Sequence, residues 1–288
     1  MSTEIITSRN GLKAVKIANA AASAEIMLLG AHLVSYKTAD GREHLWMSER
    51  SFFEEGKPIR GGVPICWPWF GPNADNSALP AHGLVRQRLW EFVGAEETDA
   101  RTTRCTFAIR DTPELRKLWN HAFELSITFT VSDTLTIALT TKNTGDTPFT
   151  ISQALHTYFR IQDIMKAEVL GLENKAFTNK AGGRTSEEKM GNAPVTFGME
   201  VDRVFHDAPG PFTLLDKAAG KSVRITTEGS NSAVTWNPWI EKSIKMSADF
   251  PPEGYKEMVC VETANALADA RIVRPGEAHT LKAHYTFE

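Results

Sequence analysis

Cysteine is scarce in this chain, which has only three among its 288 residues. Cys66, Cys105 and Cys260 lie far apart and form neither a CxxC pair nor any other zinc-site spacing. Three isolated cysteines provide no disulfide framework, and free cysteine is commonly buried. We therefore expect three buried, reduced thiols, which favours a cytoplasmic protein.

Long apolar runs and an excess of one charge are also absent. No window approaches the roughly 20 apolar residues that a membrane helix needs. The segment Met1–Asn10 contains the acidic Glu4 and no long apolar stretch, so we do not interpret it as a signal peptide. The formal net charge of −3 gives no reason to expect nucleic acid or an anionic membrane as a partner. These absences favour an ordinary soluble globular protein.

Signals for helices and for nucleotide-binding loops are few. The chain has no strand–helix alternation, no GxGxxG and no P-loop, which argues against a doubly wound nucleotide-binding fold. Two short helix candidates are Ser48–Glu54 and Thr112–Leu118, the second with Pro113 in the first turn, where proline is tolerated. Helices are therefore expected to be few and short.

The dominant pattern is instead an apolar–polar alternation of period two. It is clearest in Ala122–Ser132 and Leu135–Thr141, which are separated by the turn residues Asp133 and Thr134 and predict a β-hairpin with one buried face. Lys175–Asn192 is polar and is interpreted as an exposed connection. Further strands are expected at Leu12–Ala18, Glu25–Leu29, Leu89–Ala95, Arg104–Ile109, Thr147–Leu155, Ala233–Asn237 and Thr280–Phe287. The pattern predicts one all-β domain of many antiparallel strands.

The segment Arg60–Pro72 (RGGVPICWPWFGP) contains three glycines, three prolines, two tryptophans and a phenylalanine within 13 residues. It cannot be a regular central strand, because proline removes donors from the ladder. Gly61 and Gly62 would allow the backbone to approach a ligand closely, and rings such as Trp67 would offer flat faces for a sugar. The alternative is a rigid, well-packed loop without a ligand, and the residues alone leave both interpretations open.

Ionisable side chains stand out in three further segments. AHGLVR contains His82 and Arg86, and SQALHTYF contains His156 at the end of an expected strand. Val259–Asn265 places Glu262 in a strongly apolar run, although glutamate is rarely buried without a partner. A buried acid of this kind is a candidate functional residue. Each has an ordinary alternative: a structural histidine, a surface arginine, or a carboxylate that holds a loop.

Taken together, these segments resemble the aldose 1-epimerase (galactose mutarotase-like) superfamily. The resemblance rests on RGGVPICWPWFGP, AHGLVR, ALHTYF, WNPW and VCVETAN, which lie between Arg60 and Asn265 in the family's order. The sequence looks most like the hexose-6-phosphate mutarotase branch of YeaD-like proteins. The resemblance implies that residues 1–288 form a single domain, a large antiparallel β-sandwich with a substrate cleft on one concave face.

The resemblance also implies roles for individual residues. By position in their motifs, His156 corresponds to the family's general acid and Glu262 to its general base. His82 matches a histidine that contacts the sugar near its ring oxygen, and Asp202 matches an aspartate that hydrogen-bonds sugar hydroxyls. The other substrate-binding residues that it implies are two arginines and two tryptophans, namely Arg60, Arg86, Trp67 and Trp236.

The activity that this set implies is the interconversion of the anomers of a hexose 6-phosphate, with glucose 6-phosphate as the natural substrate. A base removes the proton of the C1 hydroxyl while an acid protonates the ring oxygen, and the ring then recloses on the other face of C1. Neither a metal nor an organic cofactor is needed, the partner is a small sugar or sugar phosphate, and we expect a monomer. Free-hexose mutarotases also keep an arginine near the position of Arg60, so Arg86 is the more discriminating residue.

Other classes of protein remain as alternatives. A non-catalytic carbohydrate-binding sandwich would not need both His156 and Glu262. A metal-dependent jelly-roll enzyme could use His82, His156 and Glu262 as ligands, but the chain lacks the His-x-His pair usual in that class. Glycosidases generally use two carboxylates, whereas here the second partner is a histidine.

Overall fold

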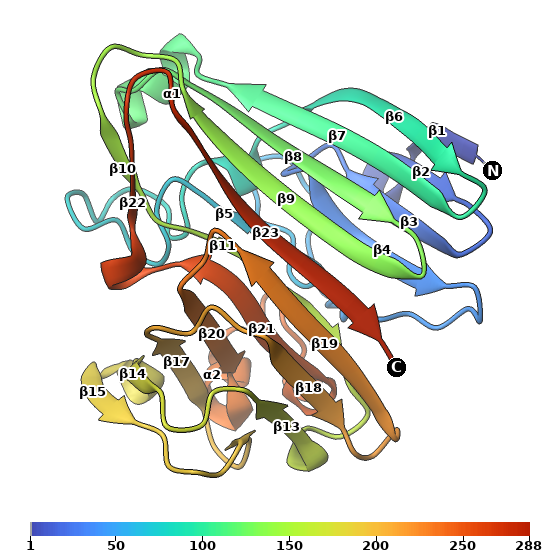
Figure 1. The fold of residues 1–288 in the computed structure, drawn as a ribbon, viewed down its shortest axis with the longest axis vertical. Helices are drawn as coiled ribbons and strands as arrows, with labels where there is room; N and C mark the ends of the chain where they lie inside the picture. Colours follow the sequence, from blue (N-terminus) through green and yellow to red (C-terminus); the bar gives the residue numbers. More distant parts are fainter. Residues whose placement is uncertain (1) are drawn as a thin grey trace.

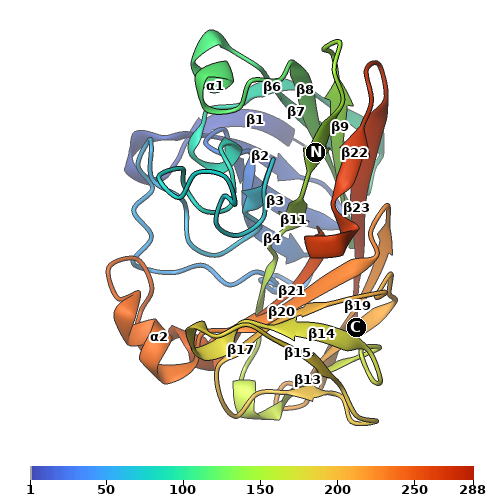
Figure 2. The same cartoon turned by 90° about the vertical axis from the view of Figure 1, so that its left-hand side faces the viewer.

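The computed structural model describes residues 2–288, and these form antiparallel strands arranged in two layers (Figure 1). A nine-stranded sheet makes one layer. A four-stranded sheet contacts its β8 strand, and an eight-stranded sheet contacts its β23 strand. Seen from the side in Figure 2, the β1–β4 strands lie on one side of β8, β9 and β23. This architecture confirms the expected all-β sandwich.

The nine-stranded sheet has the order β16-β13-β18-β19-β23-β9-β8-β7-β6. Its strands are β6 (Glu91–Asp99), β7 (Thr102–Arg110), β8 (Phe123–Val131), β9 (Thr134–Asn143), β13 (Ala167–Leu170), β16 (Val195–Thr196), β18 (Phe212–Asp216), β19 (Lys221–Glu228) and β23 (Ala278–Phe287). The four-stranded sheet consists of β1 (Ser2–Thr7), β2 (Lys13–Ala18), β3 (Ala22–Met27) and β4 (His32–Thr38).

The eight-stranded sheet has the order β15-β14-β17-β20-β21-β11-β5, and β12 also pairs with β21. Its strands are β5 (Ile65–Cys66), β11 (Gln153–Leu155), β12 (Tyr158–Arg160), β14 (Ala176–Asn179), β15 (Ser186–Lys189), β17 (Val201–Phe205), β20 (Ser232–Asn237) and β21 (Met258–Asn265). A separate pair joins β10 (Phe149–Ile151) to β22 (Arg271–Val273).

The expected hairpin is formed by β8 and β9, with Val131 opposite Leu135 beside the turn. Along β8 every second side chain is buried, from Phe123 to Val131, because one face of the strand packs on the core between the layers. Burying a large apolar side chain typically stabilises a fold by about 1.5–3 kcal/mol. The apolar residues of the alternating pattern are therefore the ones that the structure buries.

The central strands β20 and β21 differ, because every residue in them is buried. One face of β21, including Val259 and Val261, belongs to the main core between the layers. The opposite face carries Cys260, Glu262 and Ala264, and Ala264 packs in a second, smaller cluster with residues of neighbouring strands. A polar side chain on this second face is therefore buried within the protein.

Residues 2–288 contain two short α-helices, α1 (Pro113–Leu118) and α2 (Trp239–Lys245). The first was expected: Thr112 Oγ1 accepts the Leu115 N–H at 3.2 Å, and Pro113 occupies the first turn. None of the helices in the described residues has the length and apolar character needed to cross a membrane. The 3-10 turns are η1 (Arg9–Gly11), η2 (Val85–Gln87), η3 (Ile164–Lys166), η4 (Ala181–Gly183), η5 (Gly254–Glu257) and η6 (Leu267–Asp269).

Two expectations about local structure are wrong. Ser48–Glu54 is not helical, because Ser48 Oγ donates to the Asp249 carbonyl and accepts the Arg50 N–H, while Phe53 takes a φ of 44°. The Lys175–Asn192 segment is not a plain connection. It contains β14 and β15, which form a hairpin at the edge of the eight-stranded sheet.

The Arg60–Pro72 segment contributes only the two-residue strand β5 to a sheet. Gly61 and Gly62 allow other segments of the backbone to pack closely against this one. A Cβ at Gly61 would lie 2.5 Å from the Trp46 carbonyl oxygen, and one at Gly62 would lie 2.2 Å from the Leu33 carbonyl oxygen. The close approach that these glycines permit in the described residues is thus to backbone, as the alternative of a well-packed loop expects, and an approach to a ligand stays a prediction.

Candidate active site

Strand register gathers polar side chains on the second face of the eight-stranded sheet. The pairing of β17 with β20 and of β20 with β21 places Asp202 opposite Trp236, and Trp236 opposite Cys260. Glu262 lies two residues beyond Cys260 and therefore shares its face. His156 lies between β11 and β12, which both pair with β21. Residues that are distant in the sequence thus converge on one strand.

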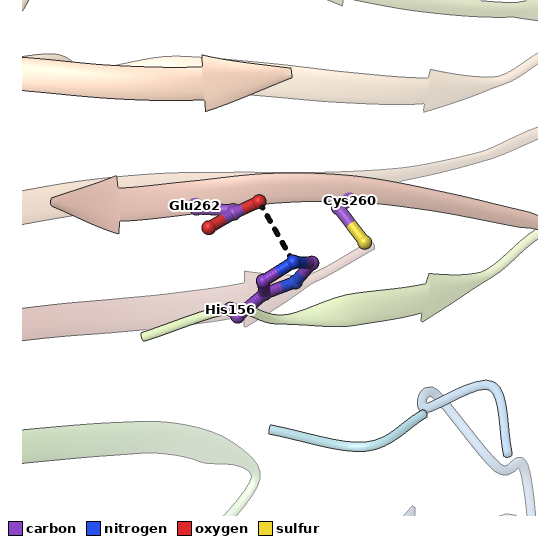
Figure 3. Close-up of side chains that lie close together, drawn as sticks. All are labelled: His156, Cys260 and Glu262. Carbon is purple, nitrogen blue, oxygen red and sulfur yellow. Dashed lines mark ion pairs between the residues drawn. The ribbon is translucent and has the colours of Figure 1, made fainter. Parts of the chain in front are cut away.

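His156 and Glu262 form a close, buried pair (Figure 3). The Nε2 atom of His156 lies 3.4 Å from the Oε1 atom of Glu262, and the residues are 9% and 1% exposed. The Glu262 Oε2 and His156 Nδ1 atoms are buried and have no hydrogen-bond partner within residues 2–288. Such an unsatisfied carboxyl oxygen is costly in a folded protein, which indicates a group kept for a purpose other than stability.

The surroundings push the two pKa values in opposite directions. Burial raises the pKa of Glu262 well above its ordinary value, and the nearby charge of Asp202 adds to this effect. Burial lowers the pKa of His156 well below its ordinary value, helped by His82, Arg86 and Arg60. Both groups therefore favour their neutral forms, with the proton on the carboxyl group and a neutral imidazole.

His82 lies beside this pair, with its ring centroid 5.7 Å from that of His156 and 5.1 Å from that of Phe70. Its Nδ1 atom accepts the Gly71 N–H at 3.3 Å and lies 3.4 Å from the Cys66 sulfur. The Nε2 atom must then carry the proton of the neutral ring. Burial, followed by the charges of the arginines, lowers the pKa of His82 to about 3, so the residue is a neutral hydrogen-bond donor.

Two arginines lie on the same side of the cluster. Arg60 donates from Nε and Nη2 to the Asp249 Oδ2 atom at 3.2 and 3.0 Å, and from Nη1 to the Tyr158 hydroxyl at 3.4 Å. Arg86 follows the His82 loop on η2 and donates from Nη2 to the Ala81 carbonyl at 2.8 Å, while its buried Nε has no partner in the described chain. Each arginine is close enough to act on the pKa of His82. Asp249 compensates the charge of Arg60, so Arg86, which has no acidic partner in the described residues, supplies the net positive charge at this end of the cluster.

Asp202, Trp236 and Tyr158 complete the cluster. Burial raises the pKa of Asp202, and Lys242 opposes that rise from 3.3 Å. The Tyr158 ring is stacked on the His156 ring at 4.9 Å, and the Trp236 ring meets the His156 ring edge-on at 5.9 Å. The imidazole of His156 is thus fixed between two aromatic rings.

One of the expected substrate-binding residues, Trp67, is not brought to this cluster. Its side chain is fully buried, and its Nε1 donates to the Thr141 hydroxyl of β9, in the opposite layer. Its ring also packs on Trp119 and Phe123. It therefore belongs to the core between the layers, and the aromatic ring of this segment that reaches His82 is Phe70.

Several residues of the cluster were missed in the sequence. Tyr158 lies within the ALHTYF motif, but the sequence assigned it no role. Asp249 and Lys180 carried no signal of their own. Lys180 donates its backbone N–H to the Asp202 carbonyl at 2.7 Å, and its charge lowers the pKa values of His82 and Asp202. These residues reach the site only because the folded chain brings distant segments side by side.

The chain is similar to known proteins along nearly its whole length. The profile of the family described as aldose 1-epimerase matches residues 13–286. A protein of Escherichia coli (strain K12), provisionally named a glucose-6-phosphate 1-epimerase, is 38% identical over 256 residues, which are 89% of this chain and 84% of the relative. A relative from Cenchrus ciliaris with the same provisional name is 33% identical and covers 95% of this chain and 84% of its own length.

Solved structures share the fold. The crystal structure of a provisionally assigned mutarotase (YeaD) from Salmonella typhimurium superposes with a TM-score of 0.90 at 31% identity, over 97% of this chain and 92% of the other. A galactose mutarotase-like protein from Lactobacillus casei has a TM-score of 0.75 at 16% identity, over 96% of this chain and all of the other, and shows the fold alone.

Proposed function

The chain belongs to the aldose 1-epimerase family, and on this premise we propose that it interconverts the α and β anomers of a hexose 6-phosphate. The provisional names of its relatives from Escherichia coli and Cenchrus ciliaris support glucose 6-phosphate as the substrate. The observation that carries the proposal is the buried His156–Glu262 pair, with 3.4 Å between Nε2 and Oε1.

The geometry of the pair suits the hemiacetal centre of a sugar. The C1 hydroxyl oxygen and the ring oxygen are bonded to the same carbon, so a base on one and an acid on the other must lie close together. Glu262 is the base that removes the hydroxyl proton, and His156 is the acid that protonates the ring oxygen. Each positioned proton transfer typically contributes about 10²–10⁴-fold to the rate.

The pKa directions of His156 and Glu262 fit the number of protons that the two residues share in this step. Ring opening uses the arrangement of the pair in which Glu262 is ionised and its proton lies on His156, and it ends with neutral Glu262, neutral His156 and the open-chain aldehyde. The site holds the same single proton in both states, and only its position changes. Burial disfavours the ion pair, so ring opening returns the two residues to the neutral arrangement that burial favours. Reclosure on the other face of C1 runs the transfer backward.

The positive end of the cluster supports a phosphate on the substrate. Guanidinium groups present a planar fork of donors that matches phosphate oxygens. The buried Nε of Arg86 is free of partners in the described residues and can donate to an added anion. His82, with its proton on Nε2, donates to the sugar near its ring oxygen, and Asp202 accepts from sugar hydroxyls.

The test is the rate of anomer exchange, measured by NMR saturation transfer with and without the protein. Glucose 6-phosphate, free glucose and free galactose are compared at equal concentration. We expect faster exchange for the phosphosugar. Acceleration of the free sugars alone would overturn the phosphate assignment and leave a free-hexose mutarotase. No acceleration of any sugar would overturn catalysis and leave a carbohydrate-binding protein.

A further inference from the structure

Cys260 brings a thiol to the His156–Glu262 pair. Cys260 and Glu262 point to the same side of β21, and His156 points toward both from the segment between β11 and β12 (Figure 3). One ligand atom from each residue, a sulfur, a nitrogen and an oxygen, lies within 4.8 Å of the other two. All three residues are buried. The acid–base step proposed above uses the histidine and the glutamate but has no use for the thiol.

The spacing is that of ligands around one tetrahedral metal ion. Zinc bonds of about 2.0–2.3 Å to nitrogen, oxygen and sulfur place neighbouring ligand atoms about 3.3–3.7 Å apart. The His156 Nε2 and Glu262 Oε1 atoms are already 3.4 Å apart. The sulfur needs a shift of about 1 Å at most to reach the same range, which rotation about one side-chain bond can supply.

The composition of the set also favours zinc. Imidazole and thiolate together select zinc over magnesium or calcium, which prefer oxygen ligands. Glu262 retains a second oxygen, Oε2, that is buried and lacks a partner within residues 2–288. A cation between the three side chains would replace the carboxyl proton and compensate the charge of the resulting carboxylate. Three protein ligands leave a fourth position for water.

We propose that His156, Cys260 and Glu262 form an inhibitory binding site for zinc or a similar thiophilic divalent cation. Binding replaces the thiol proton of Cys260 and the carboxyl proton of Glu262, both of which leave to solvent, and occupies the histidine nitrogen and carboxylate oxygen that face the substrate. Metal and sugar therefore exclude each other. Metal-ligating histidines normally have an outer-shell partner, and its loss costs about 10–100-fold in affinity. His156 Nδ1 lacks one in the described chain, so the metal is held weakly and reversibly.

The decisive experiment is a Co²⁺ titration of the chelator-treated full chain in the absence of substrate. Cobalt replaces zinc in tetrahedral sites, and a thiolate ligand gives a sulfur-to-cobalt charge-transfer band in the near ultraviolet. We expect one Co²⁺ per chain with this band, its displacement by Zn²⁺, and competition by glucose 6-phosphate. This binding assay does not depend on turnover, so its result stays separate from the test of the proposed function.

Substitutions of single cysteines test whether the metal binds at Cys260. Cys260→Ser should remove the band. It should raise the Zn²⁺ concentration for half-inhibition by more than the roughly 10–100-fold that loss of an outer-shell partner costs, because a direct ligand is lost. The matched control is Cys105→Ser, which removes a buried thiol from β7 in the other layer. It should leave the band and the inhibition unchanged.

A second variant covers the case in which Cys260→Ser does not fold. Glu262→Gln keeps all three thiols and should still weaken Co²⁺ binding, because a neutral amide is a poor ligand. Absence of the band in the wild-type protein would overturn the proposal. So would a band that survives Cys260→Ser, or one that depends on Cys66, the thiol beside His82.

Discussion

At the scale of single residues, Glu262 combines a stability cost with the proposed chemistry. Its carboxyl group is buried in a strand covered on both faces, and one oxygen has no partner among the described residues. Leaving a buried polar atom unpaired costs about 1–3 kcal/mol. The neutral amide of glutamine has nearly the same shape and cannot become a buried charge.

We therefore expect Glu262→Gln to lose turnover without losing stability. Anomer exchange should fall by about 10²–10⁴-fold, the usual value of a positioned base. The urea midpoint should stay at or above that of the wild-type protein. His156→Ala should cause a similar loss of exchange because the ring oxygen then lacks its acid. Exchange at the wild-type rate in either variant would remove that residue from the mechanism.

Arg86 allows a separate test of the phosphate assignment. Arg86→Gln removes the charge but keeps an amide that can donate to the Ala81 carbonyl, the contact that Arg86 makes with the His82 loop. If Arg86 binds the phosphate, kcat/KM for glucose 6-phosphate should fall by about 10–100-fold, in line with the loss of a charged hydrogen bond worth about 1.5–3 kcal/mol. Exchange of free glucose, measured as the control, should change little; equal losses on both sugars would refute the assignment.

The candidate site could be predicted from the sequence only in part. His82, His156 and Glu262 carry the family resemblance, and the structure brings them together. Trp67 looked equally suitable, but a sequence cannot tell which face of a short loop turns toward the core. Asp249 lies far from Arg60 in the sequence, and only the folded chain brings the two together. The pKa directions could not be inferred because they depend on burial.

At the scale of strands and helices, one hydroxyl pair joins the two layers directly beneath the site. The Tyr285 hydroxyl of β23 lies 2.8 Å from Thr157 Oγ1, and both residues are buried. Thr157 follows His156 in the chain, and its side chain points to the face of the eight-stranded sheet opposite to that of His156. The position of the His156 backbone therefore depends on contact with the nine-stranded sheet.

Tyr285→Phe should lower the free energy of unfolding by about 1–3 kcal/mol, because the Thr157 hydroxyl loses its main partner. It should also reduce kcat by about tenfold or less, the equivalent of roughly 1.4 kcal/mol at the transition state. Tyr36→Phe is the matched control. It removes another buried hydroxyl between the layers, the donor to the Ser132 carbonyl. It should destabilise the protein with no change in kcat, and an equal kcat loss in both variants would contradict the coupling.

Strands were predictable where one face is buried and the other is only half-buried, as in β8 and β9. Where both faces are buried, as in β21, the alternation disappears and an apolar run from Met258 to Val261 remains. The helix α2 was missed because Pro238 and the adjoining tryptophans gave no helical period. The β14–β15 hairpin was missed because β15 is exposed along its whole length at the edge of its sheet.

At the scale of the whole molecule, buried histidines set the response to acid. Burial lowers the pKa of His32 from 6.5 to about 4, partly opposed by its hydrogen bond to the Gly61 carbonyl and helped by the charge of Arg86. Burial also lowers the pKa of His44 to about 4. The unfolded chain therefore binds more protons than the folded chain between pH 6.5 and 4, and stability must fall as the pH falls through this window.

His32 alone accounts for a loss of about 3 kcal/mol, at roughly 1.4 kcal/mol per pKa unit. Glutamine can keep the bond to the Gly61 carbonyl but does not titrate. We expect His32→Gln to reduce the acid loss by up to this amount when urea unfolding is compared at pH 7 and pH 4.5. Equal losses in the two proteins would show that His32 does not titrate on unfolding.

The strand order also has a consequence for biosynthesis. β23 lies in the middle of the nine-stranded sheet, between β9 and β19, although the ribosome makes it after the other strands of that sheet (Figure 1). Until residues 278–287 emerge, β9 and β19 present open edges, and exposed edges invite pairing with other chains. A nascent chain that stalls before this point would lack the support that Tyr285 gives to the site and would be a natural client for chaperones.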